Sequence, residues 1–161
     1  MDESEPPEHA RYRQYLQALA HVSDEMELAV VRAVLTDDDL GMACAAVLRH
    51  IELRSVELLR EPEYTAWEQG LAQVVAGHPY VVRRLSEESL FRAIELDLPW
   101  TEMALREATD WLQRLVSHAS TSPVALTILA ENGRTRRVRN AARLKIKGGA
   151  AESRSDSSRR A

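Results

Sequence analysis

The sequence predicts an all-α protein of about seven or eight helices, arranged as short antiparallel pairs. Apolar residues make up 45% of the 161-residue chain, enough for a core that covers most of it. They recur about every three or four residues nearly throughout, and no stretch alternates long enough to make a convincing strand. Turn signals separate these segments by about two to five residues, which is typical of stacked helical pairs rather than a bundle of long helices.

Three helices account for the first part of the chain. Residues 8–21 carry tyrosines and leucines on one face. Ser23 is the expected N-cap of a second helix, because acidic residues follow it and suit the positive end of a helix. Thr36 with Asp39 three residues later resembles a capping box, and it predicts a third, longer helix over about 38–60.

The middle of the chain continues the same alternation of apolar stripes and turn signals. Residues 63–76 form one expected helix, and a short helix follows the next turn. Ser86 is expected to cap another helix, which Pro99 stops. From Thr101 to Ala119 the apolar spacing is unbroken, and it predicts one continuous helix.

Two helices close the predicted domain. Pro123 occupies the favoured first position of one helix, and Gly133 is expected to end it. The last helix covers about 135–147, after which no large apolar residue occurs. The predicted organisation is a flexible acidic N-terminus (1–7), one all-helical domain (8–147) and a disordered Arg/Ser-rich tail (148–161).

The segment 122–144, SPVALTILAENGRTRRVRNAARL, carries a family resemblance. A helix that begins with proline is followed by a turn and then by Val138-Arg139 with Ala142 three residues later. This pattern resembles one unit of a HEAT or variant leucine-rich repeat α-solenoid, whose turn ends in D-x-x-x-V-R-x-x-A; here Glu131-Asn132-Gly133 stands where the Asp is usual. The resemblance implies a degenerate HEAT-like solenoid with a concave binding surface and no intrinsic chemistry.

Motifs for catalysis, cofactors and metals do not occur in the sequence. The single cysteine, Cys44, lies on an apolar stripe, where a buried small hydrophobe is expected rather than a nucleophile. The five histidines show no metal-binding spacing, and there is no P-loop or G-x-S-x-G. Without a signal peptide or a membrane-spanning run, we expect a cytoplasmic, non-enzymatic protein with no cofactor and no metal.

Charge is divided unevenly along the chain. The net charge of −4 separates at Gly133 into −12 for residues 1–133 and +8 for residues 134–161. Such asymmetry indicates an anionic partner for the basic end, or contact between the two parts. Arginine supplies nearly all the positive charge, which is also typical of a GC-rich, for example bacterial, genome.

The basic last helix is the strongest candidate for binding. Its predicted positive face is Arg136, Arg139, Arg143 and Lys147, opposite an apolar face of Val138, Ala141, Ala142 and Ile146. Such a concentration of charge suits phosphate or an acidic surface, although it also fits simple solvation of the domain end. The full set of candidate anion- or partner-binding residues is Arg134, Arg136, Arg137, Arg139, Arg143, Lys145 and Lys147. Trp100, which follows a proline at a helix start, is the candidate interface aromatic.

Together these features predict a non-enzymatic helical-repeat adaptor that contacts a protein partner. The alternative is a nucleic-acid-binding protein that uses the basic helix 134–147.

Overall fold

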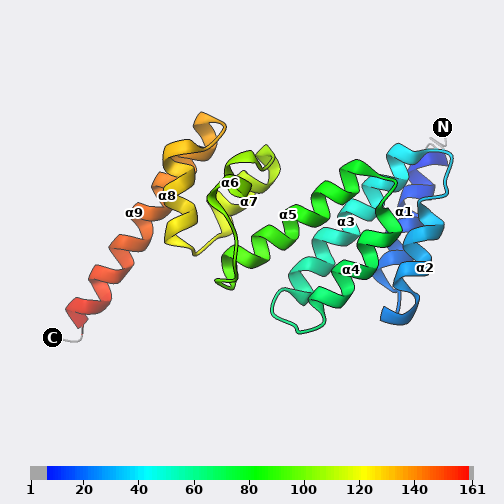
Figure 1. The fold of residues 1–161 in the computed structure, drawn as a ribbon, viewed down its shortest axis with the longest axis horizontal. Helices are drawn as coiled ribbons and strands as arrows, with labels where there is room; N and C mark the ends of the chain where they lie inside the picture. Colours follow the sequence, from blue (N-terminus) through cyan, green and yellow to red (C-terminus); the bar gives the residue numbers. More distant parts are fainter. Residues whose placement is uncertain (1–6, 160–161) are drawn as a thin grey trace, which may run out of the picture. The chain divides into compact units, whose positions relative to one another are not determined.

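The computed structural model describes the backbone of residues 7–159 and the side chains of residues 9–149. Within these residues the chain forms nine helices and no strand, which confirms the all-α class (Figure 1). The chain divides into two compact units, Met1–Glu88 and Ser89–Ala161, instead of the single helical domain expected over 8–147. The boundary lies inside a helix, because two separate apolar clusters form on either side of it.

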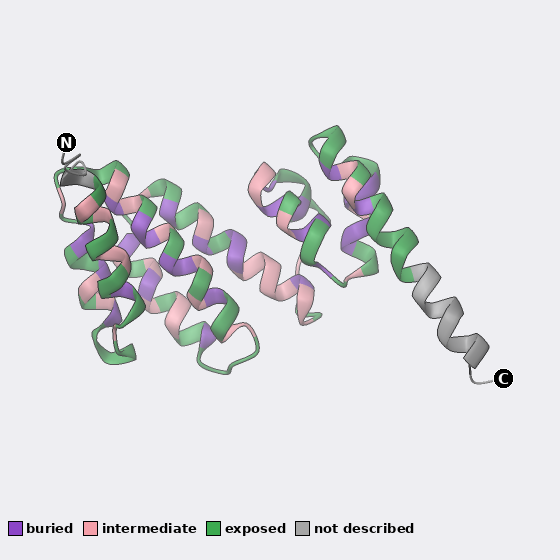
Figure 2. Cartoon of the chain, turned by 180° about the vertical axis from the view of Figure 1, so that it is seen from behind, coloured by how far each residue is buried: buried purple, intermediate pink, exposed green. Residues whose placement is uncertain are grey.

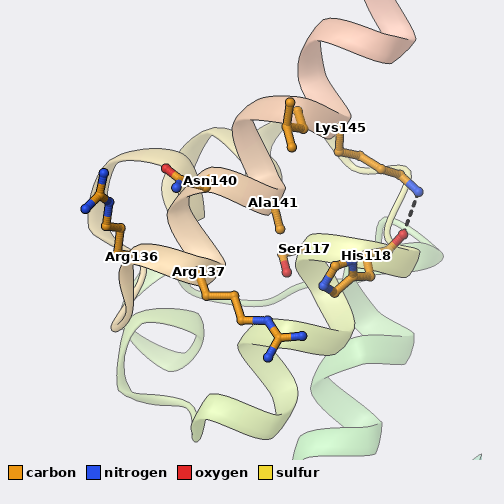
Figure 3. A pocket seen from close by; sticks show the side chains of 8 residues that line it. Ser117, His118, Arg136, Arg137, Asn140, Ala141 and Lys145 are labelled. Atoms are coloured by element: carbon orange, nitrogen blue, oxygen red, sulfur yellow. Dashed lines mark hydrogen bonds between the residues drawn. The ribbon is translucent and has the colours of Figure 1, made fainter.

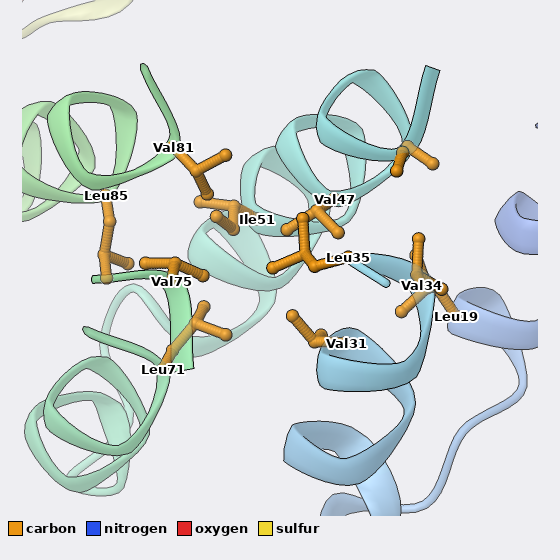
Figure 4. Packing of buried hydrophobic residues seen from close by; sticks show 12 residues of the cluster. Leu19, Val31, Val34, Leu35, Val47, Ile51, Leu71, Val75, Val81 and Leu85 are labelled. Carbon is orange, nitrogen blue, oxygen red and sulfur yellow. The ribbon is translucent and has the colours of Figure 1, made fainter. Parts of the chain in front are cut away.

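Unit 1 contains four helices and the first part of a fifth: α1 (Pro7–Ala20), α2 (Asp24–Val34), α3 (Leu40–Leu58), α4 (Tyr64–Val75) and α5 (Pro79–Glu95). Helix α1 packs on α3 and α2, and α2 packs on α4. Their buried residues converge on one core (Figure 4), whose larger members are Leu19, Val31, Val34, Leu35, Val47, Ile51, Leu71, Val75, Val81 and Leu85. Burying each of these aliphatic side chains contributes about 1.5–3 kcal/mol of transfer free energy.

Polar side chains are also buried inside unit 1, around Glu27. Its carboxylate accepts hydrogen bonds from His50 Nε2 at 2.6 Å and from Trp67 Nε1 at 2.9 Å. The guanidinium of Arg54 lies 3.4 Å from its other oxygen. Because a buried carboxylate is tolerated only when it is hydrogen-bonded and paired, this network holds α2, α3 and α4 in a defined register.

Unit 2 begins in α5 and continues through α6 (Glu102–Glu107), α7 (Asp110–Ala119), α8 (Pro123–Asn132) and α9 (Arg136–Arg159). Helix α9 packs on both α8 and α7, and α6 packs on α8. The buried faces of these helices appear as purple bands in Figure 2. The core that they share consists of Ile94, Leu105, Ala108, Leu112, Val116, Ala125, Leu126, Leu129, Ala130, Val138 and Ala142.

Several predicted helix ends are confirmed. Ser122 caps α8 by accepting the Ala125 N–H, with Pro123 as the first helical residue, and Gly133 follows the helix as its C-cap. Ser23 is the N-cap residue of α2, although its side chain makes no capping hydrogen bond. Thr36 does not cap α3: its hydroxyl donates to the Ala33 carbonyl behind it, and Asp39 caps α3 instead.

Two of the predicted boundaries are wrong. Ser86 begins no helix, because its hydroxyl donates to the Val82 carbonyl four residues earlier and α5 continues through it to Glu95. The predicted helix from Thr101 to Ala119 is two helices, α6 and α7, because the chain leaves helical geometry at Ala108 and Thr109. Apolar spacing continues across that break and conceals it.

The last helix also differs from its prediction. Helix α9 extends through Gly148 and Gly149 to Arg159, whereas the sequence predicts a disordered tail from residue 148. Two glycines lower helix propensity without preventing the backbone hydrogen bonds of a helix already formed. The predicted flexible N-terminus lies outside the described residues apart from Pro7, and so do the last two residues of the tail.

Candidate functional site: a basic groove between α7 and α9

The orientation of α9 is set by two side chains one turn apart. Val138 and Ala142 are fully buried in the core of unit 2. Thr135 caps the helix, since its hydroxyl accepts the Val138 N–H at 3.2 Å. These contacts determine which residues of α9 face α7, and therefore which of its charges border the space between the two helices.

A groove with a volume of about 720 Å³ lies along α7 and α9. Such a volume falls in the range of about 300–1,000 Å³ found for binding sites of small ligands. Figure 3 shows the row of α9 side chains above it and the end of α7 on its other side. The lining residues are Ser117, His118, Arg136, Arg137, Asn140, Ala141, Leu144 and Lys145.

Three of the predicted binding cations are engaged with backbone carbonyls. Arg139 is half-buried, and its Nη1 donates to the Gly133 carbonyl at 2.7 Å. Lys145 Nζ donates to the His118 carbonyl at 2.7 Å, at the end of α7, and Figure 3 marks this bond. Arg134 Nη1 lies 3.3 Å from the Ala108 carbonyl. Because cations near helix C-termini offset the negative end of the helix dipole, Arg139 and Lys145 stabilise the ends of α8 and α7.

Arg136 and Arg137 differ from these three cations. Both are exposed and line the groove, and no hydrogen bond or ion pair joins either guanidinium to another side chain of the described part of the chain. Each guanidinium presents five N–H donors in a planar fork that matches a carboxylate or a phosphate. These two arginines are therefore the cations of the groove that remain available to a ligand.

One buried glutamine holds the supports of the groove together. Gln113, on α7, is fully buried, and its amide nitrogen donates to the carbonyls of Leu105 and Arg106 at the end of α6. Its Oε1 accepts the Arg134 N–H at 2.8 Å, in the turn before α9. One side chain thereby satisfies three backbone groups on two separate segments, which places α7 and the start of α9 relative to each other.

The predicted basic face of α9 is only partly the face that borders the groove. Of the predicted stripe, Arg136 lines the groove, Arg139 holds a carbonyl, and Arg143 and Lys147 are exposed outside it. Ile146, expected on the apolar face, is 38% exposed. Of the predicted apolar face, Val138 and Ala142 are buried in the core as expected, and Ala141 is half-buried.

Five lining residues were not predicted as binding residues from the sequence: Ala141 and Leu144, and also Ser117, His118 and Asn140. A signal for Leu144 is present, since it shares a helical face with Arg137 and Ala141 at offsets of seven and three. Its side chain is 69% exposed, so the groove combines an apolar contact with positive charge. The other three depend on how α7 and α9 meet, which no local pattern shows.

The predicted interface aromatic is not freely exposed. Trp100 is half-buried and packs against the core of unit 2. The chain leaves α5 through Asp97, whose φ of 54° is left-handed, and the Leu98 N–H then returns to the Ala93 carbonyl. This turn precedes the stretch that brings Trp100 to the core.

A second cleft, of about 490 Å³, lies in unit 1 beside Cys44 and His78. The Cys44 sulfur lies 3.8 Å from His78 Nδ1, and burial raises the pKa of the thiol. Cys44 is half-buried rather than fully buried as expected. A thiol held in its neutral form is a poor nucleophile, so the geometry supports the structural interpretation of this residue.

No family model, curated protein or solved structure matches this chain. The resemblance to HEAT-like repeats therefore stays a prediction. Among the described residues, no three histidine, cysteine or acidic side chains come together in a way that could hold a metal ion. The helices in that part of the chain include none with the length and apolar character needed to cross a bilayer.

Proposed function

We propose that this chain is a non-enzymatic binding module that holds an acidic segment of a protein partner in the groove between α7 and α9. The observation that carries the proposal is the pairing of Arg136 and Arg137 with the exposed Leu144 in one groove. Two guanidinium groups can each take a carboxylate, while leucine offers an apolar contact in the same groove. An acidic peptide with an apolar residue has both features.

The different contacts of the cations on α9 support a protein ligand over a nucleic acid. Nucleic-acid binding gains most of its affinity from many phosphate contacts along an extended positive surface. Here Arg139 and Lys145 are engaged by carbonyls, so the groove presents two arginines and an apolar side chain. That composition is closer to a protein–protein interface, where arginine is enriched at the centre.

A labelled peptide of glutamates around a central leucine tests the groove by fluorescence anisotropy. Changing Arg136→Glu and Arg137→Glu together should weaken binding by about tenfold or more, equivalent to about 1.4 kcal/mol. The matched control is Arg143→Glu with Lys147→Glu, which makes the same charge change on the same helix outside the groove. If both double variants lose affinity equally, the groove is not the site.

Nucleic acid remains the second candidate because Arg136, Arg143 and Lys147 are exposed along α9 at offsets of seven and four. Binding to labelled duplex and single-stranded DNA or RNA across a salt series distinguishes it. A phosphate-driven complex loses affinity linearly with log salt, with a slope that counts the phosphates contacted. It should also weaken in both double variants, whereas the peptide complex weakens only with the groove pair.

A further inference from the structure

The two units carry opposite net charges. Unit 1 contains 17 acidic and 8 basic residues, a net charge of −9, and unit 2 contains 8 acidic and 13 basic residues, a net charge of +5. The charge separates more sharply at Gly133, into −12 and +8, but the two units also differ in the sign of their net charge. A chain of this kind carries both a positive surface and a candidate acidic partner for it.

One end of unit 1 has the chemistry that the groove requires. The guanidinium of Arg54 holds Asp24 at 2.7 Å and Glu57 at 2.9 Å, so these two carboxylates lie side by side. Their side chains remain 86% and 62% exposed. Glu25 and Met26 follow Asp24 directly in the first turn of α2, and both are exposed. We call Asp24, Glu25, Met26 and Glu57 the acidic patch.

Arg54 does not neutralise this patch. The same guanidinium also contacts the buried carboxylate of Glu27, at 3.4 Å. Burial opposes ionisation of Glu27, but the hydrogen bonds from His50 and Trp67 and the charge of Arg54 outweigh it and lower its pKa. One arginine is therefore shared among three carboxylates, and Glu25 adds a further negative charge. The surface retains the charge needed to attract arginines from another molecule.

We propose that the acidic segment bound by the groove is the acidic patch of a second copy of this chain, an inference that rests on the proposed function. Arg136 and Arg137 of one copy pair with the carboxylates of the other. The exposed Met26, at 54%, contacts the exposed Leu144. Groove and patch are different surfaces of the same chain, so each contact joins the groove of one copy to the patch of another.

Sedimentation of the full-length protein tests this assembly. The weight-average mass should rise with protein concentration above the 18.1 kDa of one chain at about 0.1 M salt, and it should return to that value near 1 M salt, where the Debye length is about 3 Å. A mass that stays at one chain under all low-salt conditions would overturn the inference. Peptide binding to the groove would then persist, so the proposed function is judged separately.

Two neutralised variants determine which surfaces meet. One carries Arg136→Gln and Arg137→Gln and keeps the patch; the other carries Glu25→Gln and Glu57→Gln and keeps the groove. Each alone should sediment as a single chain, and an equimolar mixture should form a species of twice that mass and no larger, because only one pair of intact surfaces remains. A mixture that stays monomeric contradicts the proposal. Arg143→Gln with Lys147→Gln, outside the groove, should associate like the unchanged protein.

Discussion

Two buried glutamates give the stability of unit 1 opposite responses to pH. Glu27 and Glu88 are 3% and 4% exposed, yet their surroundings differ. Burial opposes ionisation of Glu27, but donors from His50 and Trp67 and the charge of Arg54 hold its pKa below the usual 4.5. Burial and the negative charge of Glu52 raise the pKa of Glu88 to about 8, although Arg84 acts in the opposite direction.

Glu27→Gln should destabilise the protein by about 1–3 kcal/mol at neutral pH, because the buried carboxylate loses its charge-assisted hydrogen bonds. A lowered native pKa adds stability above the unfolded-state value, and this stability is lost as the pH falls through the native pKa. The difference between variant and parent should therefore shrink below about pH 4.5. Urea unfolding followed by tryptophan fluorescence measures this difference, with the exposed Glu61→Gln, outside the acidic patch, as the control.

Glu88→Gln should have the opposite effect on the stability of the protein. Because the native pKa of Glu88 is about 8 against the usual 4.5, the native state binds more protons than the unfolded chain between these values. Stability of the unchanged protein should therefore fall as the pH rises from about 4.5 to about 8. The glutamine variant should be more stable than its parent by about 1–3 kcal/mol above pH 8 and nearly equal to it at acid pH. A constant offset at every pH would contradict this assignment.

At the scale of elements, close approach rather than backbone strain requires glycine after α8. Gly133 has a φ of −56°, which any residue can adopt. A Cβ at this position would lie 2.6 Å from the Leu129 carbonyl oxygen and 2.8 Å from Val138 Cγ1. The turn between α8 and α9 is therefore packed too tightly for a methyl group, and Gly133 keeps Val138 seated in the core.

Gly133→Ala should consequently destabilise unit 2 by about 1–3 kcal/mol, the usual cost of overpacking. Gly77→Ala is the matched control, because a Cβ at Gly77 meets nothing within 4 Å. Alanine at that position should be neutral or slightly stabilising, since it lowers the conformational entropy of the unfolded chain. Thermal unfolding of both variants checks the contrast. Equal losses of stability in the two variants would mean that backbone conformation, and not the space around the Cβ, determines the effect.

Local sequence signals predict where helices occur, but not which side chains of each helix face its neighbours. The start of α8 at Pro123 and its end at Gly133 are visible in the sequence because their chemistry is local. The prediction at Ser86 is wrong because a serine can either cap a helix or donate to a carbonyl within one. Which of the two it does depends on the whole of α5 and not on the local sequence. The two roles of the α9 cations are equally invisible: Arg139 and Lys145 are distinguished from Arg137 by carbonyls that folding brings near.

At the scale of the whole molecule, the two apolar clusters share no residue. A domain boundary usually falls in a linker, where composition changes. Here it falls within α5, at the four polar residues 86–89, where the sequence suggests a new helix but no linker, so the sequence predicts one domain. The uneven charge is visible in the sequence, whereas the division into two cores becomes apparent only in the fold.

Because the two cores are separate, we expect each unit to lose stability independently of the other. Leu71 in unit 1 and Leu112 in unit 2 are both fully buried leucines. Truncating either one to alanine should cost about 2–5 kcal/mol. Hydrogen exchange should show faster exchange across α6–α9 for Leu112→Ala while α1–α4 keep their protection, and the reverse for Leu71→Ala. Loss of protection throughout the described helices in either variant would show that the two units unfold as one.

The bonds from Arg139 to the Gly133 carbonyl and from Lys145 to the His118 carbonyl also affect how quickly a ligand can bind and leave. They fasten α9 to the ends of α8 and α7 before any ligand arrives, so its backbone loses little freedom on binding. Free and bound forms should then superimpose closely along the first turns of α9. Changes at Arg136 and Arg137 should raise the dissociation rate of the ligand as well as lower its association rate. The effect on the dissociation rate should persist when salt is added.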